Sequence, residues 1–222
     1  MNHIHAAALA LGLAASTNAA LVTIDSIVYT GTAPVESGIN LGNATNLING
    51  TGLSAALTDG NIGTVTHSNP SFSSPGNAWT TNASAPDFFA APTGTVVFEI
   101  FFDQSYQVGD FYNWSYDFDE PYVNANNIRT VTIEYGVGDF ASSLGSVNLT
   151  PLTGNNGSTA TSLGGIAADR IRLTVTDNYY GLAGTGGGDR VSAAEFAFTA
   201  VPEPSAAILL GLGGLALARR RR

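Results

Sequence analysis

Between residues 20 and 200 the chain consists of short runs rich in β-branched and aromatic residues, and this pattern most constrains its fold. No long stretch there shows the 3.6-residue period of an amphipathic helix. The expected strands are residues 21–29, 95–102, 108–118, 130–135, 147–149, 170–176 and 191–198. Because turns rich in Gly, Asn, Ser and Thr separate them, the sequence predicts an all-β, antiparallel β-sandwich.

Alternation with a period of two indicates which side chains face the core of this sandwich. Side chains two residues apart in a strand lie on the same face of the sheet. The expected core includes Val131, Ile133, Ile171, Leu173 and Val175, and large aromatics add Trp79 and Trp114.

The two ends of the chain have a different composition. Residues 6–15 (AAALALGLAA) suit the apolar region of a secretory signal, and small residues favour cleavage after Ala19. Residues 205–218 are apolar throughout, and Arg219, Arg220, Arg221 and Arg222 follow. An apolar helix of this length is shorter than the hydrocarbon core of a bilayer, and the arginines favour the cytoplasmic side. The sequence therefore predicts an exported protein with a short C-terminal apolar helix.

Charge and residue inventory exclude several functions. The chain has no cysteine and no lysine, so disulfides, thiolate metal sites and cysteine nucleophiles are excluded. Between residues 20 and 200, four arginines face sixteen carboxylates, a net charge of −12 that disfavours nucleic acid. His67 is the one histidine after the signal, in a polar segment without a nucleophile-elbow motif. We therefore expect no catalytic residues.

The C-terminal segment resembles the PEP-CTERM sorting signal of bacteria that make exopolysaccharide. The likeness rests on Pro202, Glu203 and Pro204, on the apolar run up to residue 218, and on the four terminal arginines. The resemblance implies recognition and cleavage by an exosortase-type membrane protease. It also implies transient anchoring in the inner membrane and a location at the cell surface or in the extracellular matrix.

Residues 53–200 resemble a discoidin, or coagulation factor 5/8 type C, domain, preceded by a strand and loop at residues 20–52. The likeness rests on short blocks in the expected order, at residues 55–64, 78–80, 98–116, 129–135, 170–181 and 192–198. The resemblance implies a galactose-binding-like jelly roll that binds ligands through loops at one end.

The same resemblance implies a structural calcium ion. The implied ligands are Asp59, Thr64 and Glu195, with the main-chain carbonyl oxygens of Ala56 and Asn61. Calcium takes six to eight hard oxygen ligands, which a tight loop of this composition supplies in large part. The alternative is an Asx-turn with an unrelated surface glutamate.

Exposed aromatics in the ligand-binding loops would stack on a sugar ring, and we expect this role for Tyr122, Tyr179 and Tyr180, with Asp119 bonding hydroxyls. Two alternatives to this binding of extracellular polysaccharide remain. One is a purely structural matrix or display protein. The other is a glycan-active enzyme built on Asp117, Asp119 and Glu120, which a solvated acidic loop explains more simply.

Overall fold

The computed structural model of the protein describes residues 19–37, 41–68, 76–84, 86–116, 123–150 and 157–201. The signal helix and the tail helix expected from the sequence lie outside these ranges, as do Asp119, Tyr122 and residues 202–222. Ala19–Val201 form one compact unit. No helix in the described part of the chain has the length and apolar character needed to cross a bilayer.

Two long strands run through the whole fold. β4 (Val96–Trp114) and β8 (Ser158–Asn178) pair antiparallel along their lengths. The sequence predicted two strands in the region of β4, at residues 95–102 and 108–118. The structure joins them into one, because the polar residues between them continue the strand past a register shift that lies between Phe101 and Tyr106.

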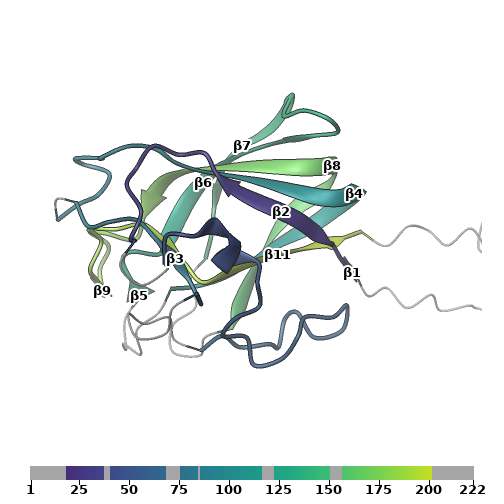
Figure 1. The fold of residues 1–222 in the computed structure, drawn as a ribbon, viewed down its shortest axis with the longest axis horizontal. Coiled ribbons are helices and arrows are strands. Elements are labelled where there is room, and N and C mark those ends of the chain that lie inside the picture. The colour runs from purple at the N-terminus through teal and green to yellow at the C-terminus, as the bar shows by residue number, and fades with distance from the viewer. Residues whose placement is uncertain are drawn as a thin grey trace, which may run out of the picture. The chain divides into compact units, whose positions relative to one another are not determined.

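Seven antiparallel strands form the main sheet, in the order β1-β11-β4-β8-β6-β7, with β2 also paired to β4 (Figure 1). The remaining members are β1 (Ala20–Leu21), β2 (Ile24–Tyr29), β6 (Ile128–Gly136), β7 (Ser142–Asn148) and β11 (Glu195–Ala200). Two small pairs are added: β3 (Trp79–Thr80) with β10 (Ser192–Ala193), antiparallel, and β5 (Val123–Asn124) with β9 (Thr185–Gly186), parallel. A 3-10 turn, η1, covers Ala44–Leu47.

The sheet folds over on itself and so forms the two layers of a sandwich. The first half of β4 pairs with β2, whereas its second half pairs with β11. Aromatic rings of the first half of β4 meet rings of β11 in the core, with centroids 5.9 Å apart for Phe98 and Phe196 and 5.3 Å apart for Phe102 and Phe198. The predicted all-β, antiparallel architecture is confirmed.

The predicted core residues are buried as expected. Val131, Ile133, Ile171, Leu173 and Val175 are each at most 5% exposed, and Trp79 and Trp114 are fully buried. The five aliphatic residues lie on one face of β6 and of β8 because of their period-two spacing, which is why the sequence alone identified them.

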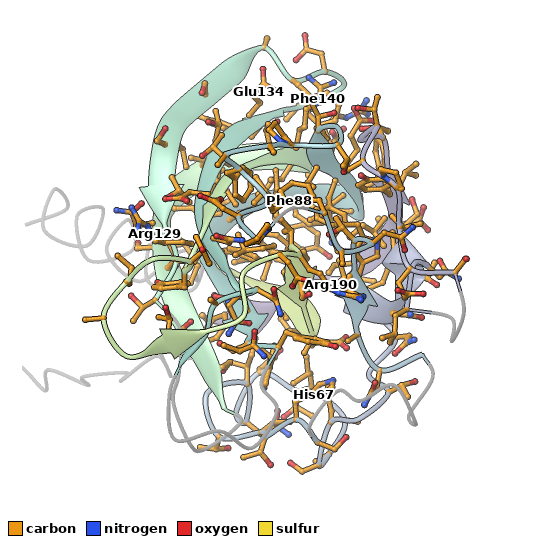
Figure 2. The ribbon with its side chains drawn as sticks, turned by 90° about the vertical axis from the view of Figure 1, so that its left-hand side faces the viewer. His67, Phe88, Arg129, Glu134, Phe140 and Arg190 are labelled. Atoms are coloured by element: carbon orange, nitrogen blue, oxygen red, sulfur yellow. The ribbon has the colours of Figure 1, made fainter. Side chains whose placement is uncertain are left out.

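The outer face of the sheet carries a network of ion pairs. Arg172 on β8 contacts Glu99 at 2.9 Å and Glu134 at 3.3 Å. Its guanidinium also lies 4.1 Å from the ring centroid of Phe140. Figure 2 shows Glu134 and Phe140 at the end of the molecule opposite His67. Both carboxylates of this network thus have a cationic partner within the chain.

Candidate ligand and cation sites

A pocket of about 340 Å³ lies where the loop of residues 48–57 meets β1, β2 and the start of β11. It is lined by residues 21–24, 48–50 and 195–197 together with Leu53, Ala56 and Leu57. The walls are mainly apolar, and Glu195 is the ionisable side chain among them. The predicted ligands Ala56 and Glu195 thus line the same pocket.

Glu195 is a carboxylic acid buried without a compensating cation in the described part of the chain. Its side chain is 2% exposed, and Oε1 accepts a hydrogen bond from the N–H of Gly50 at 3.0 Å. The second oxygen, Oε2, has no hydrogen-bond partner among the described residues. Burial raises the pKa of Glu195 to about 8, against the smaller opposing effect of the Gly50 bond. At neutral pH the carboxyl group is therefore mainly protonated unless a cation binds it.

The other predicted calcium ligands lie in one tight loop. The Asn61 carbonyl oxygen accepts a hydrogen bond from Thr64 Oγ1 at 2.9 Å, and Asn61 Nδ2 donates to the Ala56 carbonyl oxygen at 2.9 Å. Asp59 is exposed, and its Oδ1 accepts from the N–H of Leu21, which lines the pocket, at 2.7 Å. Ala56 in the pocket wall and the bond from Leu21 to Asp59 thus connect this loop to the pocket that contains Glu195.

The donor set of this region consists of two carboxylates, two carbonyl oxygens and a hydroxyl. Within the described ranges, no three acidic or histidine side chains are grouped closely enough to hold a metal ion by themselves. Such a set of hard oxygens suits calcium rather than a transition metal. The unpartnered Oε2 of Glu195 supplies the observation in favour of a cation here, because a buried carboxylate needs a partner for its charge. The calcium site itself stays a prediction.

His67 is buried rather than solvated, although its neighbours are polar. Its side chain is 2% exposed, Nδ1 lies 2.6 Å from the Ser68 carbonyl oxygen, and Nε2 has no partner in the described structure. Burial lowers the pKa of His67, opposed by the backbone contacts with Ser68 and Thr51. The ring packs against Gly52, where an added Cβ would lie 2.6 Å from Cε1. His67 thus holds in place the segment that also bonds Glu195.

The predicted sugar-binding tyrosines have different surroundings. Tyr180 is 39% exposed, and Leu182, two residues further along the chain, is 42% exposed. Tyr179 is half-buried, and its hydroxyl donates a hydrogen bond to the Leu149 carbonyl oxygen. The ring of Tyr180 is therefore accessible to a ligand, whereas the hydroxyl of Tyr179 is already used within the fold.

Buried asparagines, which the sequence did not single out, support the loop that carries Tyr180. Asn126 Oδ1 accepts from the N–H groups of Gly188 at 2.9 Å and Arg190 at 3.1 Å. Asn178 Nδ2 donates to the carbonyl oxygens of the same two residues, and Asn178 Oδ1 accepts from the Tyr180 N–H at 3.1 Å. Side-chain hydrogen bonds, some between residues far apart in the sequence, thus fix this loop. Figure 2 labels Arg190, one of the residues bonded in this way.

Comparison with solved structures identifies the class of fold. The F5/8 type C domain of a Bacteroides fragilis protein matches with a TM-score of 0.51 at 11% identity, covering 84% of this chain and 99% of that domain. The family 32 carbohydrate-binding module of NanJ from Clostridium perfringens, solved in complex with galactose, matches with a TM-score of 0.44 at 14% identity, covering 81% and 98%. The fold is that of the F5/8 type C, or discoidin-like, domains.

The sequence comparison then identifies the tail. Residues 200–222 match the PEP-CTERM protein-sorting motif. A search of curated proteins finds no match to this chain. The chain is thus an exported protein with a PEP-CTERM sorting motif that follows a discoidin-like β-sandwich.

Proposed function

We propose that the protein is a non-catalytic, surface-sorted protein whose sandwich binds carbohydrate through its loops. The sorting motif at residues 200–222 supports export and processing by an exosortase-type membrane protease. The observation that carries the binding proposal is the exposed Tyr180 on a loop fixed by buried asparagines. An aromatic ring held in place loses little conformational entropy when it stacks on a sugar. More of the contact energy therefore contributes to the free energy of binding.

The segment that contains the other predicted sugar contacts leads into the strand that pairs with this loop. β9, at the end of the loop, pairs with β5, so that Val123 is the partner of Thr185. Asp119 and Tyr122 come shortly before Val123 in the sequence. We propose that the ligand is a neutral glycan of the extracellular polysaccharide, because the strong negative charge of the domain disfavours anionic polymers.

Binding to a polysaccharide panel tests this function. The mature domain, residues 20–201, should bind at least one neutral glycan, and Tyr180→Ala should weaken that binding about tenfold or more, since about 1.4 kcal/mol of lost contact corresponds to a factor of ten. Val137→Ala is the matched control, because Val137 is an exposed apolar residue, 58% exposed, directly after β6. Absence of binding to every glycan would favour the purely structural matrix protein instead.

We further propose that calcium supports the loops. Ala56, Asp59, Asn61, Thr64 and Glu195 would bind the ion, which would supply the missing positive charge beside Glu195 and tie the loop to β11. The unpartnered Oε2 of Glu195, in a pocket shared with Ala56, supports this proposal.

Thermal unfolding tests the calcium proposal. Calcium at about 100 times its Kd should stabilise the domain by about 2.7 kcal/mol relative to chelator, measured as a rise in Tm. Glu195→Gln should abolish most of this rise. Equal Tm values with calcium and with chelator in the original protein would contradict the proposal.

A further inference from the structure

The folded domain ends directly before the sorting motif. β11 ends at Ala200, and the N–H of Val201 still donates to the carbonyl oxygen of Gln107 at 2.7 Å. Pro202, the first residue of the Pro-Glu-Pro motif, is the next residue in the chain. No spacer therefore separates this hydrogen bond from the segment to be processed.

The end of β11 is hydrogen-bonded on both sides. Thr199 is the partner of Leu21 on β1 and of Asp110 on β4, and Ala200 is paired in the same way on both sides. A peptidase that binds an extended segment by main-chain hydrogen bonds needs the groups that these neighbouring strands occupy. In the closed sheet, residues 199 and 200 thus have no free strand edge to offer.

Several features weaken this end of the strand. The register of β11 against β4 shifts between Thr199 and Ala200. The hydroxyl of Thr199 is buried without a hydrogen-bond partner in the described structure, which destabilises the packed state relative to an open, hydrated one. Val201 is 44% exposed and makes only partial contact with the domain. β1 itself has only two residues, so opening breaks few bonds.

We propose that residues 199–201 are part of the segment that the sorting peptidase binds, and that they must leave the sheet before the tail is cleaved. This inference rests on the proposed processing of the tail. Local opening of the β1–β11–β4 edge then limits the rate of processing, while the rest of the sandwich stays folded. Residues 199–201 thereby link the folded state of the domain to its sorting.

The first experiment follows tail loss from the full chain in a bacterium that carries the cognate sorting protease, by pulse-labelling and mass analysis of the C-terminus. A spacer of about six Gly and Ser residues inserted between Val201 and Pro202 should speed processing several-fold, because about six extended residues span roughly 20 Å. Thr199→Val, which replaces the unpartnered hydroxyl with a methyl group, should slow it several-fold. The same insertion placed in the exposed turn at Gly138 is the control and should have no effect.

A disulfide provides the stronger test, because the chain contains no cysteine of its own. Leu21 and Thr199 are cross-strand partners, at a separation that a disulfide spans. The oxidised Leu21→Cys, Thr199→Cys variant should lose its tail at least tenfold more slowly. Reductant, or the spacer added to the same variant, should restore the rate.

The outcomes separate this inference from the proposed sorting. If the original chain is processed but the disulfide and the spacer both leave the rate unchanged, the opening step is refuted and the sorting function stands. If the original chain retains its tail in that host, both are overturned. Slowing by the disulfide that the spacer relieves supports the opening step, because global destabilisation would not respond to the spacer.

Discussion

Two acidic regions of this domain differ in how their charge is balanced. On the outer sheet face, Glu99 and Glu134 are a fifth to a third exposed, and Arg172 binds both. In the pocket, Glu195 is almost fully buried, and its partner in the described structure is the backbone N–H of Gly50. In the first region, each carboxylate has a cationic partner within the chain. The second has a buried acid whose ionisation requires a partner from outside the described chain.

This difference shows how to recognise a binding position in a strongly acidic protein. Carboxylates are numerous, so their presence carries little information. Burial without a cation is the informative property, since a charge in an apolar setting is costly unless it is paired. If burial without a cation is what matters, the two regions should also differ in their contribution to the free energy of unfolding.

The largest effect should come from titrating Glu195 without calcium. Its pKa in the folded protein, about 8, lies above its unfolded value of about 4.5, so the folded state binds the proton more tightly. The resulting stability is complete below about pH 4.5 and is lost as the pH rises towards 8. By about pH 7 the loss should be on the order of 3 kcal/mol, and Glu195→Gln should abolish it.

Urea unfolding between pH 4.5 and 8, with chelator present, measures this difference across the window set by the two pKa values. All other titrating groups are common to the two proteins, so the difference between their curves isolates Glu195. Parallel curves would show that Glu195 is solvated and would remove the contrast between the two regions. Added calcium should flatten the curve of the original protein and leave that of the variant unchanged.

An intermediate effect is expected where the sandwich holds the loop beside the pocket. Trp114 Nε1 donates to the Val65 carbonyl oxygen at 2.9 Å, and both residues are buried. Trp114→Phe should therefore lower the free energy of unfolding by about 2 kcal/mol, because the carbonyl loses its donor. Trp79→Phe is the matched control: Trp79 is equally buried, but its Nε1 has no partner in the described structure.

The comparison of the two tryptophan variants is informative in either direction. Chemical denaturation should show a larger loss for Trp114→Phe than for Trp79→Phe. A larger loss for the Trp79 variant would mean that packing in the sheet core, and not the bond to Val65, decides stability at these positions.

The smallest effect is expected on the outer face. Arg172→Met should cost less than about 1 kcal/mol, because ion pairs that water still reaches contribute little. The cost should shrink further in about 1 M salt, where the Debye length is about 3 Å. Thermal unfolding at two salt concentrations checks this. A loss of several kcal/mol that persists in high salt would show that this face is as sensitive as the Glu195 pocket.

Much of the fold was predictable because it depends on local pattern. Val131 and Ile133 on β6, like Leu173 and Val175 on β8, follow the period-two rule and are buried as expected. The continuity of β4 was not predictable, because residues 103–107 are mainly polar and their pairing depends on β8. A register shift of this kind has no signal in either strand alone.

The sequence singled out several residues of the candidate sites, and their roles in binding stay predictions. The resemblance to discoidin-like domains singled out Glu195 and the loop of residues 56–64, and the structure places Glu195 and Ala56 in the lining of one pocket. The burial of His67 was missed, because the residues that cover it, Gly52 and Leu53, lie about 15 positions earlier in the sequence. The asparagine support of the Tyr180 loop was missed for the same reason, since Asn126 bonds Gly188, 62 positions away.

The pairing of Ala20 with Ala200 places the two ends of the domain one strand spacing apart, about 4.8 Å. A domain whose termini are adjacent can be inserted into a surface loop of another protein without separating the ends of that loop. It can also be circularly permuted by a short linker between these ends, with new termini in an exposed turn such as that at Gly138. Because its two ends are adjacent, the domain is suited to insertion into an unrelated protein scaffold.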